Sequence, residues 1–254
     1  MADEMKKLRK RVRRKRIRKI IIGLLITVVS AIVIIVLINI FFVVKNIEIK
    51  NETSYDALEV LEYAGVKDGT SIFSVNGDKI YEKIVEKYPY VSSVKTEISL
   101  PNSINVSLAT TTAKICAKTK SGKFIALDKS LKVLEESVSQ IPDTIFADGL
   151  EIEKYKIGKV LDENSSPDTL LLSEILTSID LYFSDISVKN VDMTKKYSII
   201  VNLDNITIEL GNSEELDRKM KMARKVYDDN DASVKAIINV RDYTKGRYRT
   251  LENQ

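Results

Sequence analysis

The strongest constraint on the fold is an uncharged, almost wholly apolar run at residues 20–44, which reads IIIGLLITVVSAIVIIVLINIFFVV. A helix of this length rises about 37 Å, enough to cross a hydrocarbon core of about 30 Å with some tilt. In lipid, each backbone amide needs a partner within the segment, which only a helix provides for a single span. The sequence therefore predicts a transmembrane helix at residues 20–44.

The charges on either side of this run differ in sign. Residues 1–19 hold eleven basic and two acidic side chains, a net charge of +9, whereas the rest of the chain holds 29 basic and 34 acidic side chains, a net charge of −5. The positive-inside rule predicts that residues 1–19 form a basic cytoplasmic tail and that the remainder lies outside the cytoplasm. The tail is expected to contact the anionic lipid of the inner leaflet.

Two other interpretations of the N-terminal region fit less well. A cleaved signal peptide has an apolar core of about 7–15 residues and a small-residue cleavage site, whereas this run is longer and continues as IFFVVKNIEI. A basic arm can bind nucleic acid, but directly before an apolar run it is typical of a topology signal. We therefore expect an uncleaved span and no nucleic-acid partner.

The sequence pattern of residues 45–110 predicts five secondary-structure elements in the order β-α-α-β-β. The first helix begins at a capping-box pattern, Thr53–Asp56, and ends at Gly65. The second helix has an apolar stripe and ends before Pro89. The two helices include Leu58–Ala64 and Asp78–Tyr88. The three predicted strands are residues 46–50, 91–98 and 104–108. One sheet with both helices on one face buries these apolar stripes economically.

Residues 111–241 predict a second, β-rich α+β domain, followed by a polar segment at 242–254. Short alternating strands, turn signals and two amphipathic helices support this. Ile141-Pro142 and Asp148-Gly149 indicate a loop-rich stretch. The expected elements are strands Lys114–Thr119, Lys123–Leu127, Leu131–Leu134, Ile186–Asp192, Tyr197–Leu203, Ile206–Leu210 and Val234–Val240, with helices starting at Ser166-Pro167-Asp168 and Ser213.

The residue types argue against catalysis. The chain has no histidine, so it lacks Ser–His and Cys–His nucleophile systems and His-based metal sites. Its single cysteine, Cys116, cannot form an intrachain disulfide and is expected to be a buried strand residue. Ser92–Lys95 spells S-x-x-K, but in a predicted strand the serine and lysine point to opposite faces. We expect no catalytic residue, no metal site and no cofactor.

The order of these features resembles the FtsQ/DivIB family of bacterial cell-division proteins. The module after the span is similar to a POTRA domain, and the second domain also fits the family. The similarity rests on Val44–Asn51 (VKNIEIKN), Gly65–Phe73 (GVKDGTSIF), Tyr88–Val91 (YPYV), Leu100–Pro101, Phe124–Asp128 (FIALD), Ile208–Gly211 (IELG), Lys219 and Ile238–Arg241 (INVR). The chain departs from the family at Thr111–Lys114, where Glu-Arg-x-Pro is common, and at Asn239, where Asp is commoner.

The resemblance implies a non-enzymatic, membrane-anchored scaffold of the divisome, located at the division septum. The implied partners are small coiled-coil division proteins of the FtsB/DivIC and FtsL type, with the septal peptidoglycan synthase complex as a further candidate. Two alternatives from other classes are a single-span sensor of the anti-sigma type and a POTRA-type polypeptide chaperone. A sensor of this type needs a folded cytoplasmic effector domain. A POTRA-type chaperone would be expected to have repeated POTRA modules or a following barrel.

The candidate partner-binding site lies near the C-terminus. We expect the strand Val234–Val240 to leave a sheet edge open, where unpaired backbone groups accept a partner strand. The resemblance places partner binding in the same part of the chain. Tyr243 and Tyr248 would be aromatic anchors, and Arg241 and Arg247 would face acidic partner residues. The predicted site is Arg241, Tyr243, Lys245, Gly246, Arg247 and Tyr248. The competing interpretation is that residues 241–254 are a frayed polar tail.

Overall fold

The computed structural model describes residues 2–162 and 166–251, with side chains from Lys19 onward. The chain forms two compact units, and each is described by itself. The first contains the residues up to Asn51, 55–80 and 94–108, and the second contains 52–54, 81–93 and the residues from Ala109 onward. The domain limits 45–110, 111–241 and 242–254 stay predictions.

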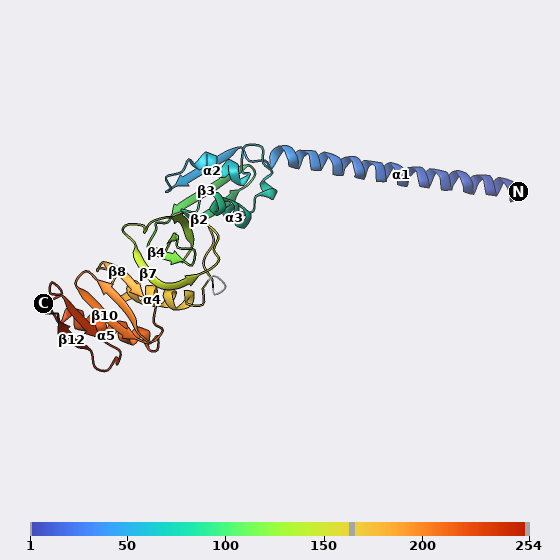
Figure 1. Ribbon diagram of the computed structural model, residues 1–254. Helices are drawn as coiled ribbons and strands as arrows, with labels where there is room; N and C mark the ends of the chain where they lie inside the picture. The colour runs from blue at the N-terminus through green and yellow to red at the C-terminus, as the bar shows by residue number, and fades with distance from the viewer. Residues whose placement is uncertain (1, 163–165, 252–254) are drawn as a thin grey trace. The chain divides into compact units, whose positions relative to one another are not determined.

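Helix α1 (Ala2–Phe41) includes residues 20–41 of the predicted span and ends three residues before its predicted end at Val44 (blue in Figure 1). Its section Lys19–Phe41 is, within the described residues, the one helix long and apolar enough to cross a membrane. The polar side chains Thr27, Ser30 and Asn39 each donate a hydrogen bond to the carbonyl four residues earlier, at 3.0, 2.8 and 2.8 Å. The helix therefore satisfies these polar groups internally, as a hydrocarbon environment requires.

The five elements predicted after the span are present in the predicted order. A three-stranded sheet has the order β1-β3-β2, with β1 parallel to β3. On β3 the side chains of Ile104, Val106 and Leu108 are buried and alternate with partly exposed ones, so one sheet face is covered. The elements are β1 (Asn46–Asn51), α2 (Ala57–Ala64), the short helix η1 (Ile72–Ser74), α3 (Gly77–Lys87), β2 (Val91–Ser99) and β3 (Ser103–Thr110). These elements confirm the α+β, β-α-α-β-β fold.

The ends of α2 show which local signals act. Gly65 ends the helix in the left-handed region at φ +87°, as predicted, because glycine adopts this conformation without a Cβ clash. The start differs from the prediction. Asp56, not Thr53, is the N-cap residue, and its carboxylate accepts hydrogen bonds from the backbone N–H groups of Leu58 and Glu59 at 2.8 and 3.2 Å.

The second unit is built on a nine-stranded sheet (green to red in Figure 1). The strand order is β12-β11-β10-β9-β8-β7-β4-β5-β6, and the pairs β4/β7, β7/β8 and β10/β11 are parallel. Helices α4 and α5 contact each other, and α5 contacts β10 and β11. The elements are β4 (Ile115–Thr119), β5 (Phe124–Leu127), β6 (Val133–Ser137), β7 (Ile145–Ile152), α4 (Thr169–Tyr182), β8 (Val188–Asp192), β9 (Ile199–Leu203), β10 (Ile206–Gly211), α5 (Leu216–Asp228), β11 (Ala236–Asn239) and β12 (Arg247–Thr250).

The core of this unit lies under one face of the sheet. Neighbouring strands contribute fully buried side chains, among them Val191, Val201, Ile208 and Ile238, each 0 % exposed. Such alternation of buried and partly exposed residues is expected where one face of a sheet packs on helices. Cys116 is buried on β4, as predicted, and its burial raises the pKa of its thiol.

Three features of the second unit differ from the prediction. The Asp148-Gly149 pair lies inside strand β7 and not in a loop. Helix α4 has Asp168 as its N-cap, so Pro167 precedes the helix, and α5 follows Glu215 and not Ser213. Finally, β11 is not the last strand, because β12 follows it. Ser166 accepts a backbone hydrogen bond from Thr169, which forms a separate turn before α4.

The chain between β7 and α4 lies beside β6, and this contact gives a pH-dependent prediction. The Tyr155 hydroxyl donates a hydrogen bond to Glu136, which raises the pKa of Tyr155 from 10 to about 12. The unfolded state then loses this proton first, so the stabilising contribution is present below pH 10 and disappears as the pH rises toward 12. In an ultraviolet titration of the tyrosines, Tyr155→Phe should remove the last-titrating step. Persistence of that step in the variant would contradict this assignment.

Candidate functional site

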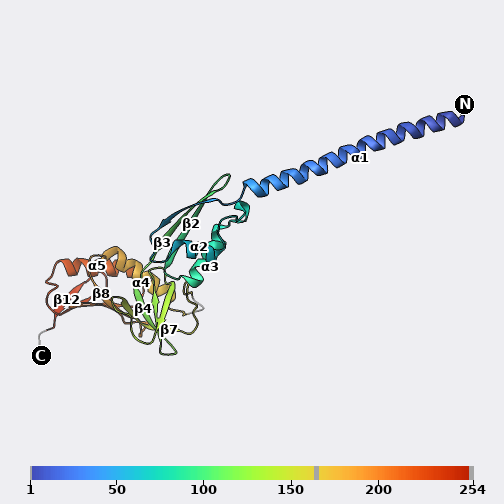
Figure 2. The same ribbon diagram turned by 90° about the horizontal axis from the view of Figure 1, so that it is seen from above.

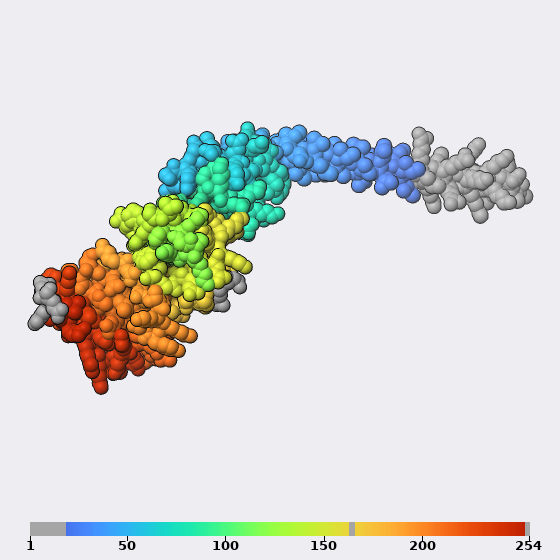
Figure 3. Space-filling view, in the orientation of Figure 1, coloured from blue at the N-terminus to red at the C-terminus, as the bar shows by residue number. Residues whose placement is uncertain are grey.

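The sheet edge at the C-terminal end is formed by β12, which covers the strand expected to be open. β12 pairs with β11 in antiparallel register, with Ile238 opposite Tyr248 and Asn239 opposite Arg247. In the part of the chain that the structure describes, no strand pairs with the other side of β12. We call β12 and the preceding loop, residues 241–246, the C-terminal edge. Its residues join those of α5 in the red surface of Figure 3.

The backbone of β12 has a fixed inner and outer side. The N–H of Leu251 donates to the carbonyl of Lys235 at 2.7 Å, so the N–H of Leu251 points toward β11. In an antiparallel pair, successive residues alternate between hydrogen-bonded and non-hydrogen-bonded positions. The backbone groups of Arg249 and Arg247 therefore also point inward, and those of Tyr248 and Thr250 point to the open side. These outward groups are the ones that a further strand would bind.

Tyr248 holds β12 on the core. Its ring packs against the buried apolar cluster of the second unit, and its hydroxyl donates to the carbonyl of Asp231 at 2.8 Å. The side chain is partly exposed. Tyr248 therefore has an internal anchoring role, in addition to any contact that it makes with a partner.

The loop 241–246 is ordered by local and helix contacts. The Asp242 carboxylate accepts hydrogen bonds from the backbone N–H and hydroxyl of Thr244 at 3.0 and 2.6 Å, which lower the pKa of Asp242. Tyr243 lies against α5, where the guanidinium carbon of Arg218 is 5.4 Å from the centre of its ring. The Arg218 guanidinium also donates to the Tyr243 hydroxyl at 3.4 Å.

Gly246 lets the loop approach α5 closely. A Cβ at this position would lie 2.6 Å from Cγ2 of Val226 and 3.0 Å from Cγ of Met222, both on α5. Real Cβ atoms do not come this close, so a larger residue would force these side chains, or the loop itself, to shift. Gly246 therefore belongs to the predicted site as a packing residue that sets the position of β12.

Arg241 lies at the start of this loop, over the end of β10. Its guanidinium is 3.4 Å from the carboxylate of Glu209, and its aliphatic stem lies over Gly211. The Asn239 amide donates to the same carboxylate at 2.7 Å. The Asn239 amide thus serves as a donor that the carboxylate of an aspartate could not replace.

The C-terminal edge is basic although the chain after residue 19 is acidic overall. Residues 241–250 contain four basic side chains and one acidic one. Arg241, Lys245, Arg247 and Arg249 are all exposed. Such a concentration of one charge favours an acidic partner segment.

The structure thus brings the six predicted residues to one edge, in different roles. Lys245 and Arg247 are exposed, whereas Arg241, Tyr243, Gly246 and Tyr248 also have contacts within the chain. Their role in partner binding stays a prediction. The sequence reasoning missed Arg249 and Thr250, which extend the same strand. The alternation Arg-Tyr-Arg-Thr at residues 247–250 is too short to mark a strand by itself.

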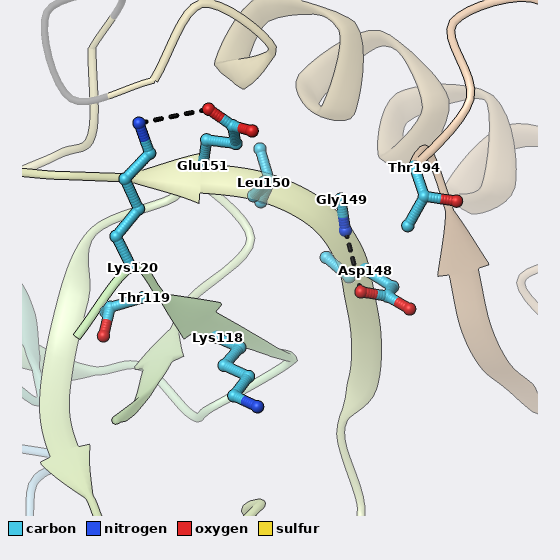
Figure 4. A pocket seen from close by; sticks show the side chains of 9 residues that line it. Lys118, Thr119, Lys120, Asp148, Gly149, Leu150, Glu151 and Thr194 are labelled. Atoms are coloured by element: carbon cyan, nitrogen blue, oxygen red, sulfur yellow. Dashed lines mark hydrogen bonds and ion pairs between the residues drawn. The ribbon is translucent and has the colours of Figure 1, made fainter. Parts of the chain in front are cut away.

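The same unit also has a concave surface away from the C-terminal edge, and this surface is less suited to binding a ligand. It has a volume of about 310 Å³ and lies where β7 bulges away from β4 (Figure 4). Its charged side chains bind neighbours in the chain. Lys120 forms ion pairs with Glu151 and Glu153 at 3.1 and 2.5 Å, and Asp148 accepts from the N–H of Gly149 at 2.9 Å.

The S-x-x-K spelling has no catalytic geometry. Ser92 lies on β2, and its hydroxyl donates to the carbonyl of Thr110 at 3.0 Å. Lys95 lies on the same strand three residues later, so the two side chains point to opposite faces. Among the described residues there is also no group of three or more Cys, Asp or Glu side chains that could hold a metal ion.

Comparisons with known proteins find a family model that matches the first module and relatives that are similar to much of the chain. Residues 42–109 match the family model described as POTRA domain, FtsQ-type. The chain is 24 % identical to the cell division protein DivIB of Clostridium tetani, over 72 % of this chain and 69 % of that protein. It is 26 % identical to DivIB of Clostridium acetobutylicum, over 72 % of each protein.

The chain is also similar, over a shorter range, to a protein named FtsQ. The chain is 28 % identical to the cell division protein FtsQ of Corynebacterium glutamicum, over 44 % of this chain and 50 % of that protein. The chain thus matches the FtsQ-type POTRA model in its first module and is similar over most of its length to cell division proteins named DivIB, which confirms the resemblance to the FtsQ/DivIB family found in its sequence.

Proposed function

We propose that this protein is a non-enzymatic, membrane-anchored scaffold that binds other division proteins and supports septum formation. Its relatives are cell division proteins, which supports a role in division. The apolar section Lys19–Phe41 would anchor it in the cell membrane. By the positive-inside rule, the strongly basic residues 1–19 support an N-terminus in the cytoplasm and a position of the residues after α1 on the other side of the membrane.

The observation that carries the binding role is the open, basic side of β12. The outward backbone groups of Tyr248 and Thr250 can accept a strand from a partner, which gives affinity through main-chain hydrogen bonds. Arg241, Lys245 and Arg247 would contact acidic partner side chains, with Arg249 beside them. Tyr243 would add an aromatic contact, and Gly246 would keep the loop in place.

The partners proposed for this edge are small coiled-coil division proteins of the FtsB/DivIC and FtsL type. The septal peptidoglycan synthase complex is a further candidate partner. An acidic, β-forming segment in such a partner would match both the open strand and the charge of the C-terminal edge.

Replacing Thr250 by proline tests the strand addition. The N–H of Thr250 points away from β11, so proline removes a donor for the partner strand and leaves the pairing within the sheet intact. We expect the affinity of the full chain for the coiled-coil division proteins of the same organism to fall about tenfold or more. Binding is measured by titration calorimetry with the full chain in detergent.

Two further variants make this test specific. Thr250→Val keeps the backbone N–H and the β-branched shape, so it should bind as the parent chain does. Arg249→Pro removes an inward hydrogen bond to β11 and should lower the unfolding temperature as well as binding. Unchanged affinity of a stably folded Thr250→Pro variant would exclude this edge as the partner site.

A further inference from the structure

The first unit exposes large apolar side chains where the chain leaves α1. Phe73 on η1 is 66 % exposed, and Leu100 in the turn between β2 and β3 is 64 % exposed. Single exposed apolar residues are common and need no explanation. These two, however, come from distant parts of the sequence, and each lies within two residues of a backbone group that is hydrogen-bonded to the segment 42–46.

Backbone hydrogen bonds tie the segment before Phe73 to the end of α1. The N–H of Ile72 donates to the carbonyl of Phe42 at 3.0 Å, and the N–H of Val44 donates to the carbonyl of Thr70 at 2.8 Å. The N–H of Gly69 donates to the carbonyl of Val44 at 2.9 Å. The rings of Phe42 and Phe73 are 5.3 Å apart. The position of Phe73 is therefore fixed relative to the first residues after the helix.

The turn that carries Leu100 is tied to the same segment. The N–H groups of Lys45 and Asn46 both donate to the carbonyl of Asn102, at 2.9 and 3.3 Å. Figure 2 shows this turn and η1 beside the end of α1. α1 ends at Phe41, and the carbonyl of the next residue, Phe42, already accepts the hydrogen bond from Ile72. The apolar helix is therefore joined to the rest of the first unit without a flexible linker.

We infer that Phe42, Phe73 and Leu100 form a membrane-contacting surface that inserts into the interface of the lipid leaflet from which α1 emerges. The inference rests on the proposal that α1 spans the membrane. A helix of the length of Lys19–Phe41 fills the hydrocarbon core, so Phe41 lies near its boundary. Side chains that backbone hydrogen bonds hold beside residues 42–46, just after Phe41, then lie at the depth where apolar groups gain from contact with lipid.

This surface has a mechanical consequence. A single span lets an attached domain rotate about the helix end and tilt against the bilayer. Two further apolar contacts, from η1 and from the β2–β3 turn, add two points of attachment and so fix the tilt of the first unit. The bilayer would thereby orient the POTRA module for its partners.

Tryptophan fluorescence tests the inference directly, because the chain contains no tryptophan. The full chain is reconstituted in phosphatidylglycerol–phosphatidylethanolamine nanodiscs with Phe73→Trp or Leu100→Trp as the one reporter. We expect emission at shorter wavelength than in an exposed position, and loss of intensity when the lipids carry brominated acyl chains. An emission maximum like that of free tryptophan, without quenching, would overturn the inference.

Two control reporters separate this inference from the proposed anchoring. Phe41→Trp, at the end of α1, reports insertion of the span and should be quenched. Leu58→Trp, 64 % exposed near the start of α2, lies at the end of that helix opposite Gly65 and should not be quenched. If Phe41→Trp is quenched and the Phe73 and Leu100 reporters are not, the anchor stands and the membrane-contacting surface is wrong. If Phe41→Trp is not quenched, the anchoring itself fails.

Discussion

Replacing Gly149 by alanine is expected to destabilise the second unit by about 3 kcal/mol or more. Gly149 lies in β7 with φ +91°, a conformation that costs about 1–2 kcal/mol for a residue with a Cβ. A Cβ there would also lie 2.5 Å from the carbonyl carbon of Met193 and against the backbone nitrogen of Thr194. Backbone atoms cannot rotate away as a side chain can, so β7 and the end of β8 would have to separate.

A second glycine separates the two causes. Gly122 has a similar φ of +87°, but a Cβ there would have no neighbour within 4 Å. Gly122→Ala should therefore cost only the conformational part, about 1 kcal/mol. The measurement is chemical denaturation of both variants and the parent, followed by circular dichroism. Equal destabilisation by the two variants would show that the contact with Met193 and Thr194 is not the cause.

The same residue explains the largest error in the predicted fold. The pair Asp148-Gly149 is a strong turn signal, and the sequence on both sides was therefore interpreted as loop-rich. In the structure the pair lies in a bulge inside a strand: the pairing of β7 with β4 shifts register between Ala147 and Ile152, and its pairing with β8 ends at Asp148. A turn and a bulge use the same residues, because both need a positive φ. Only the long-range pairing decides between them.

β12 was missed for a different reason. Its residues Arg247–Thr250 are mostly charged, and the one large apolar group, Tyr248, gives too short a pattern to mark a strand. The strand exists because β11 offers it a partner and because the Tyr248 ring packs on the core. These contacts join residues that are distant in sequence, so local patterns could not reveal them.

Elements with long apolar periodicity could be predicted. The span, the β-α-α-β-β order and the antiparallel strands β4, β5 and β6 follow from repeated side-chain patterns and clear breakers such as Gly65. The strands predicted at Tyr197–Leu203 and Ile206–Leu210 are present as the antiparallel pair β9 and β10. In these segments one local pattern and the tertiary contacts agree, and the prediction therefore needs no knowledge of distant partners.

The candidate site was predictable in place but not in detail. The sequence points to the basic, tyrosine-containing segment after residue 240, and the structure places that segment at a sheet edge. The contacts of Tyr243 with Arg218, and of Gly246 with Met222, depend on how α5 lies against the loop. No spacing within the segment encodes that helix position. The open edge also lies one strand further along the chain than predicted.

Replacing Lys132 by alanine is expected to destabilise the second unit by about 2–4 kcal/mol. Lys132 is 3 % exposed, and its ammonium donates to the carbonyl of Val91 at 2.7 Å. Both residues belong to the second unit, where this hydrogen bond holds the first residue of β2. Alanine would leave a buried carbonyl without a donor and a cavity in place of the alkyl chain. Chemical denaturation of the full chain measures the change.

Lys132→Met distinguishes the charge from the packing, because methionine fills most of the same space without an ammonium group. Burial lowers the pKa of Lys132 in the folded state, although Asp128 opposes the shift. Between that lowered pKa and the ordinary value of 10.5, the unfolded state binds more protons, so the contribution of Lys132 to stability rises with pH. The parent should gain stability relative to Lys132→Met as the pH approaches 10.5. A constant difference between the two proteins would mean that the buried ammonium has its ordinary pKa, and that the loss in Lys132→Ala comes from packing and the Val91 carbonyl alone.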